Sequence, residues 1–291
     1  MRLLALLTAV VVSSAGCSEA AGGGTTAPDG YALDMVTHSG GYWDDADVIA
    51  AAEERLVREC MRARGFTTPA PAAAEPAPRH GEVAGVDLGY RRAHGYGLTD
   101  DAVAARSPRP QPPAPPPGYD HALRGDTSVT VGKVVVASGG CMGQARAAVA
   151  GSVERWATAV YAPDFLNDDL IAATAADPAR DRAEREWQAC MAGQGYRFTG
   201  YDQPRAEAAR HPAAERRIAT ADGVCLVRAR VIETGIELRR RAALAMPPQW
   251  RAELVRAAEI RRAAAAGIRR EAAAGIRRAA AAGAPTIPGG A

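Results

Sequence analysis

The clearest pattern along the chain is a helical repeat of apolar positions in two stretches that lie far apart in the sequence. The first stripe consists of Ile49, Ala52, Leu56, Cys60 and Met61. The second consists of Ala183, Trp187, Cys190 and Met191. Spacings of three and four residues place each set on one face of a helix. We therefore expect two amphipathic helices, each carrying a cysteine on its buried side.

Both stretches end in the motif Cys-Met-x-x-x-Gly-aromatic. Gly65 and Phe66 close the first stretch, and the second closes with Gly195 and Tyr196. A glycine just beyond a helix adopts the left-handed conformation, and the apolar residue after it folds back onto the last turn in a Schellman motif. The motif predicts such a helix ending in both places, with the aromatic rings over Met61 and Met191.

Weaker patterns cover much of the remaining chain. Asp177 and Pro178 are typical of a helix start and predict that the second amphipathic helix begins there. The other expected elements are a valine-rich strand within 127–137, helices over 144–161 and 214–245, and an amphipathic segment from Trp250.

Two acidic clusters stand where helices are expected to begin. The first, Asp44 to Asp47, precedes the first amphipathic helix, and the second, Asn167 to Asp169, follows Pro163, which we expect to break the chain. Carboxylates favour helix N-termini because they accept backbone hydrogen bonds and oppose the helix dipole. Calcium binding is the alternative for the first cluster, but its spacing is not that of an EF-hand.

Two proline-rich runs, 67–79 and 107–118, flank a Gly/Tyr-rich turn segment at 95–99. Proline runs prefer extended polyproline II, so we interpret them as spacers, with docking to an aromatic groove of a partner as the alternative. The Gly-x-Gly of the turn segment lacks the strand–turn–helix context of a nucleotide site.

The last stretch repeats Ile-Arg-Arg-(Ala/Glu)-Ala-Ala-Ala-Gly from Ile260, Ile268 and Ile276. An eight-residue period rotates successive copies around a helix, so the three isoleucines do not share one buried face. Each glycine also weakens a helix by about 1 kcal/mol relative to alanine. We therefore expect 263–291 to be a low-complexity basic tail, helical at best in part, with electrostatic contact to anionic lipids or cell-wall polymers as the alternative.

The chain has 291 residues, of which 47% are apolar, 23% charged and 5% aromatic. This length supports one domain or at most two, with a core of aliphatic side chains. We predict a mainly α fold over 31–262: a disulfide-stapled helical extracytoplasmic domain with a short β element and long Pro/Gly-rich loops.

The N-terminus resembles an export signal. Arg2 precedes an apolar run of ten residues, Leu3 to Val12, which is too short for a membrane span of roughly 20 residues. Ser14-Ala15-Gly16-Cys17 resembles a bacterial lipobox, although the usual leucine is replaced by Ser14. We expect a signal peptide over 1–16, lipidation at Cys17, a flexible tether over 17–30, and anchoring at the extracytoplasmic face of the cell membrane. Ordinary secretion, with cleavage after Ala15 or Ala20, is the alternative.

Removal of Cys17 from the five cysteines leaves Cys60, Cys141, Cys190 and Cys225, an even set that an oxidising compartment would pair. Four cysteines allow three connectivities, and we favour Cys60–Cys141 with Cys190–Cys225 because these loops are the shorter ones. The spacing does not indicate a metal site.

Candidate chemistry is sparse. Cys141 follows two glycines at an expected helix N-terminus, where a lowered pKa would make it a nucleophile of a surface thiol enzyme. The compartment and the even cysteine count favour a half-cystine instead. The sequence contains no hydrolase elbow, phosphate loop or metalloprotease motif. We therefore expect a non-catalytic binding or interaction module without a cofactor, with an envelope protein or cell-wall polymer as a candidate partner and no nucleic acid.

Six short motifs occur along the chain in a characteristic order. They are Leu56-x-x-x-Cys60-Met61-x-x-x-Gly65-Phe66, Gly95-Tyr96-Gly97-Leu98-Thr99, Tyr119-x-x-Ala122-Leu123-x-Gly125, Gly139-Gly140-Cys141, Trp187-x-x-Cys190-Met191-x-x-x-Gly195-Tyr196 and Ala221-Asp222-x-x-Cys225. Over roughly 56–248 this order resembles a family of secreted actinobacterial lipoproteins without an established function. The resemblance implies an exported, mostly helical, disulfide-bearing body and brings no catalytic or ligand residues.

Overall fold

A computed structural model describes residues 27–67, 86–100 and 114–282. The fold is mainly helical, with one two-stranded sheet, as expected. The helices are α1 (Gly30–Thr37), α2 (Tyr42–Ala63), α3 (Leu88–His94), α5 (Tyr119–Arg124), α6 (Gly140–Ala150), α7 (Val153–Ala173), α8 (Pro178–Gly193), α9 (Gln203–Arg210), the short 3-10 helix η1 (Pro212–Ala214), α10 (Glu215–Arg228), α11 (Val231–Ala245) and α12 (Pro248–Ala282).

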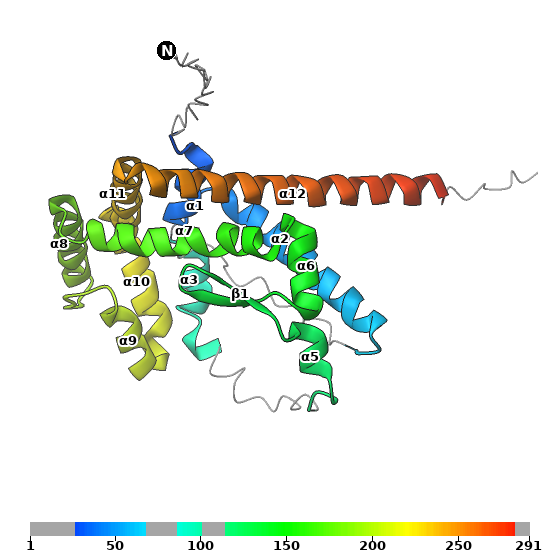
Figure 1. Cartoon of the computed structure of the whole chain (residues 1–291). Helices are drawn as coiled ribbons and strands as arrows, with labels where there is room; N and C mark the ends of the chain where they lie inside the picture. The colour runs from blue at the N-terminus through cyan, green and yellow to red at the C-terminus, as the bar shows by residue number, and fades with distance from the viewer. Residues whose placement is uncertain (1–26, 68–85, 101–113, 283–291) are drawn as a thin grey trace, which may run out of the picture.

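The two long helices α7 and α12 run side by side, and the other helices are arranged around this pair (Figure 1). Helices α8, α9 and α10 lie toward one end of this pair, and α5 and α6 lie toward the other. The expected signal peptide, most of the expected tether and most of both proline-rich runs fall outside the described residues. None of the described helices combines the length and apolar character that a membrane crossing requires.

Each end of the molecule contains one disulfide and one copy of the repeated helix ending. Cys60 of α2 is bonded to Cys141 of α6, and Cys190 of α8 is bonded to Cys225 of α10. These are the pairs that the shorter loops favoured. Each bond therefore ties an amphipathic helix to a helix that is distant in sequence.

The expected Schellman endings are present in both copies. The Phe66 amide donates to the Met61 carbonyl at 2.9 Å, and Gly65 has a φ of 83°. The Tyr196 amide donates to the Met191 carbonyl at 2.9 Å, and here Gly195 has a φ of 87°. Both methionines are completely buried. The motif therefore has two roles: it ends the helix, and its methionine packs into the core.

The motifs around Gly125 and Gly140 mark a close backbone contact between α5 and α6. A Cβ atom at Gly125 would lie 2.5 Å from the Gly140 nitrogen, a distance that no side chain tolerates. Both glycines also have positive φ. The contact brings Ala122 of α5 against the completely buried Cys141 beside the first disulfide.

The expected single strand over 127–137 is instead a hairpin. Strands β1 (Ser128–Val131) and β2 (Val134–Ala137) pair antiparallel, with Ser128 opposite Ala137. Gly132 opens the two-residue turn with a φ of 59°, which suits the positive φ of a type II′ turn. The hairpin covers α7, where Val136 packs against Trp156.

Two long helices expected from the sequence are each split in the structure. The helix expected over 144–161 is divided between α6 and α7, because Gly151 ends α6 in the left-handed conformation and the Ser152 hydroxyl caps α7. The helix expected over 214–245 is divided between α10 and α11 at Arg230, which has a φ of 51°. The apolar periodicity of the sequence continues across both junctions, but local backbone conformation and capping end one helix and start the next.

The expectation that Pro163 breaks the chain is wrong, as is the helix start at 167–169. Both lie inside α7. Proline frees the carbonyl four residues earlier, here that of Ala159, and Arg261 of α12 donates to it at 3.0 Å. A long-range hydrogen bond thus compensates for the proline, which sequence reasoning could not anticipate.

Helical structure extends beyond the expected boundary at residue 262, and part of the stretch expected to be a tail packs against the body. Helix α12 continues to Ala282. Ala264 and Ala265 are buried and, with Ile268, pack against Ile49 of α2. The isoleucines need not share one face, because alanine is small enough to let the helices approach closely between them.

Candidate binding cavity

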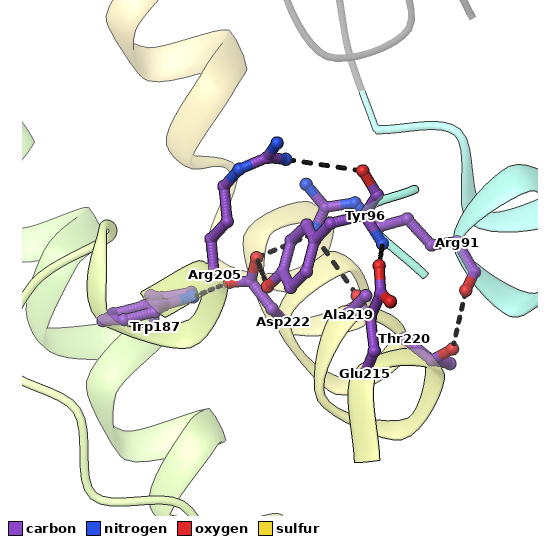
Figure 2. Close-up of polar contacts among 8 residues, drawn as sticks. All are labelled: Arg91, Tyr96, Trp187, Arg205, Glu215, Ala219, Thr220 and Asp222. Atoms are coloured by element: carbon purple, nitrogen blue, oxygen red, sulfur yellow. Dashed lines mark hydrogen bonds and ion pairs between the residues drawn. The ribbon is translucent and has the colours of Figure 1, made fainter. Parts of the chain in front are cut away.

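The Asp222 carboxylate on α10 joins side chains from distant parts of the sequence. It accepts hydrogen bonds from Arg91 at 2.7 Å, from the Tyr96 hydroxyl at 2.8 Å and from the Trp187 indole at 2.9 Å. Figure 2 shows these side chains converging on Asp222, with Arg91 and Tyr96 coming from the segment 86–100 and Trp187 from α8. Asp222 and Arg91 are both about 4% exposed, so this is a buried, fully hydrogen-bonded ion pair.

Arg91 is further fixed by its surroundings. Its guanidinium donates to the Ala219 carbonyl at 3.3 Å and lies 5.1 Å from the Tyr96 ring centroid. Its own carbonyl accepts from the Thr220 hydroxyl at 3.5 Å. The α3 segment is therefore held against α10 through one arginine.

Glu215, at the start of α10, anchors the Gly/Tyr-rich segment. Its carboxylate accepts from the backbone amides of Tyr96, Leu98 and Thr99 at 2.7–2.9 Å and from the Thr99 hydroxyl. Glu215 is 1% exposed. The turn segment thus forms a cradle of amides around one carboxylate, and this role was not apparent from the sequence.

A cavity of about 410 Å³ lies next to Arg91, between the end of α1 and helices α7, α8, α10 and α11. Its apolar wall includes Val86, Ile171, Leu226, Val231 and Ile232. Its charged wall consists of Arg91, Arg180 and Arg239. The Asp222 network forms one boundary of the cavity because it fixes the position of Arg91.

Three polar atoms at the cavity have no hydrogen-bond partner within the described chain. They are Oδ1 of Asn167, the hydroxyl of Tyr201 and Nε of Arg239. Asn167 is only 7% exposed. Buried polar groups in proteins are almost always hydrogen-bonded, and leaving one unpaired costs about 1–3 kcal/mol. Three residues that line one cavity each contain such an atom, which makes this cavity the candidate site in the described part of the chain.

The cavity is electrostatically positive. Burial lowers the pKa of Arg239, and the nearby charge of Arg180 lowers it further. Burial also raises the pKa of Tyr201 to about 12, with a smaller contribution from Glu184, so its hydroxyl is a hydrogen-bond donor at neutral pH. Asp222 neutralises Arg91, whereas Arg180 forms no ion pair with any described residue.

His38 stands at the edge of the cavity and ends α1 in the left-handed conformation. Its φ is 53°, and its Nε2 lies 3.0 Å from Asp164 Oδ1. Its ring stacks on Tyr42 at a centroid distance of 6.3 Å. The Ser39 amide donates to the Asp34 carbonyl at 2.8 Å, so the positive φ of His38 belongs to this helix ending.

The site residues expected from the sequence lie elsewhere. The four paired cysteines and the helix-end residues stabilise the two ends of the body and do not line the cavity. Cys17 is outside the described residues. Cys141 is bonded to Cys60 and completely buried, so it is not a free thiol in this structure. The described residues also contain no His/Cys/Asp/Glu cluster suited to a metal ion.

Comparison with known proteins gives no match: no family model, curated protein or solved structure is similar to this chain. The geometry of the cavity is therefore the basis for a functional proposal.

Proposed function

We propose that this protein is an exported lipoprotein, anchored through an acylated Cys17, whose helical body is a non-catalytic binding module. The lipobox-like sequence at 14–17 and the resemblance to actinobacterial lipoproteins support the anchor. The two disulfides support residence in an oxidising compartment. Acylation would place the body at the extracytoplasmic face of the cell membrane.

The observation that carries the binding function is the composition of the cavity lining. Its wall is largely apolar, and Arg180, Tyr201 and Arg239 add charged and polar groups from three different parts of the fold. Binding pockets combine a largely apolar lining with a few well-placed polar groups, and this cavity has that composition.

Metabolic labelling with an alkyne analogue of palmitate tests the anchor. We expect label on the wild-type protein in the membrane fraction, loss of label in Cys17→Ser, and no free thiol in the mature protein after denaturation without reductant. A label-free wild-type protein with four reactive thiols would contradict the proposed location.

A further inference from the structure

We propose that the cavity selects small amphipathic organic anions, that is, molecules with an acidic group and an apolar body. This inference rests on the proposed binding function and specifies its ligand class.

The positive charge of the cavity lining favours a ligand with a negative charge. Arg91 is neutralised by Asp222, which leaves Arg180 and Arg239 as the cations available to a ligand. No acidic side chain is among the described residues that line the cavity. Guanidinium groups bind carboxylates, sulfonates and phosphates through charge-assisted hydrogen bonds, which are about twice as strong as neutral ones. An anion between these two arginines would also relieve their mutual repulsion.

The apolar wall sets the second requirement. Ile171, Leu226, Val231 and Ile232 come from three helices and face the same space. A small inorganic anion would leave this surface in contact with water, whereas an organic body would cover it. The cavity volume of about 410 Å³ admits a molecule of two or three rings.

Two fluorescent probes that differ in one group test the inference. 8-Anilinonaphthalene-1-sulfonate has an apolar body, an N–H donor and an anionic group, and N-phenyl-1-naphthylamine has the same body and N–H without the sulfonate. We expect the disulfide-intact body to bind the sulfonate more tightly than the neutral probe. Arg180→Gln combined with Arg239→Gln should weaken sulfonate binding roughly ten-fold or more, since two charge-assisted hydrogen bonds are lost.

Matched controls separate charge from folding. Neutral-probe binding should change less than about two-fold in the double variant, because its contacts remain. Arg185→Gln, an exposed position on the same helix as Arg180, should leave both affinities unchanged. Arg180 forms no ion pair with a described residue, so we expect the single variant Arg180→Gln to fold normally. Its sulfonate affinity therefore tests the role of the charge without a change in folding.

The outcomes distinguish the two proposals. Equal binding of both probes, unaffected by the arginine substitutions, would overturn the anion selectivity and leave a binding cavity. Binding of neither probe to the folded wild-type body would overturn the anion selectivity and remove the cavity as the basis of the proposed function.

Discussion

The indole Nε1 of Trp187 donates to Asp222 Oδ1 at 2.9 Å, one helical turn from the Cys190–Cys225 disulfide. Both contacts join α8 to α10, because each partner of the hydrogen bond stands three residues before a bonded cysteine. Residues three apart are neighbours on a helix surface. The motifs Trp-x-x-Cys and Asp-x-x-Cys therefore describe the two sides of one helix–helix contact.

Replacement Asp222→Asn tests the buried network. It leaves the Arg91 charge buried without a counter-charge and directs an amide N–H₂ at hydrogen-bond donors. We expect the free energy of unfolding to fall by about 3–5 kcal/mol, measured by urea denaturation. Asp168→Asn, at an exposed position of α7, should change it by less than about 0.5 kcal/mol. Equal stability of the two variants would show that the network is not a major contributor.

Replacement Glu215→Gln tests the amide cradle. One carboxylate oxygen becomes a donor group that faces backbone N–H groups, so we expect a loss of about 2–4 kcal/mol. Hydrogen exchange should accelerate at the amides of Tyr96, Leu98 and Thr99 more than elsewhere. Unchanged protection of these three amides would contradict the role of Glu215.

Truncation locates the end of the packed body. A chain that stops after Arg262 loses Ala264, Ala265 and Ile268, and it exposes Ile49. We expect it to be about 2–4 kcal/mol less stable. A chain that stops after Gly275 keeps these contacts and the Arg269–Asp45 ion pair, so it should unfold like the full-length body. Equal stability of both truncated chains would show that the stable domain ends at residue 262, as the sequence analysis predicted.

Tyr201 makes stability dependent on alkaline pH. Its pKa is raised to about 12 in the folded state, whereas an unfolded tyrosine has a pKa of about 10. Between these values the unfolded chain loses the proton first, so the free energy of unfolding should decrease as pH rises from about 10 to 12. Tyr201→Phe should make this decrease smaller and leave stability at pH 7 nearly unchanged, because the hydroxyl has no partner among described residues.

Local chemistry made part of the fold predictable. The Schellman endings at Gly65 and Gly195 depend on residues within one or two helical turns, and the loop lengths between cysteines favoured the observed disulfides. The same local logic failed at Pro163, where the compensating group, Arg261, is far away in sequence.

The cavity could not be predicted because its wall is assembled from distant segments. Asn167 resembled part of a helix start, and no sequence pattern distinguished Arg180 from the other arginines. Their shared surroundings arise only after α7, α8 and α11 pack together. The sequence drew attention to Asp222, because Asp222 and Cys225 belong to one of the six ordered motifs. It did not predict the hydrogen-bond partners of Asp222.

Gly235, on the cavity wall in α11, allows the most direct test of the central claim that this cavity binds a ligand. A Cβ atom there would meet only the Arg239 side chain, at 3.9 Å, so alanine fits and should stabilise the helix by about 1 kcal/mol. A leucine at the same position extends into the cavity. The measurement is the dissociation constant of N-phenyl-1-naphthylamine for Gly235→Ala and Gly235→Leu. The account predicts wild-type affinity in the first variant and loss of binding in a folded second variant; equal affinity in both would contradict it.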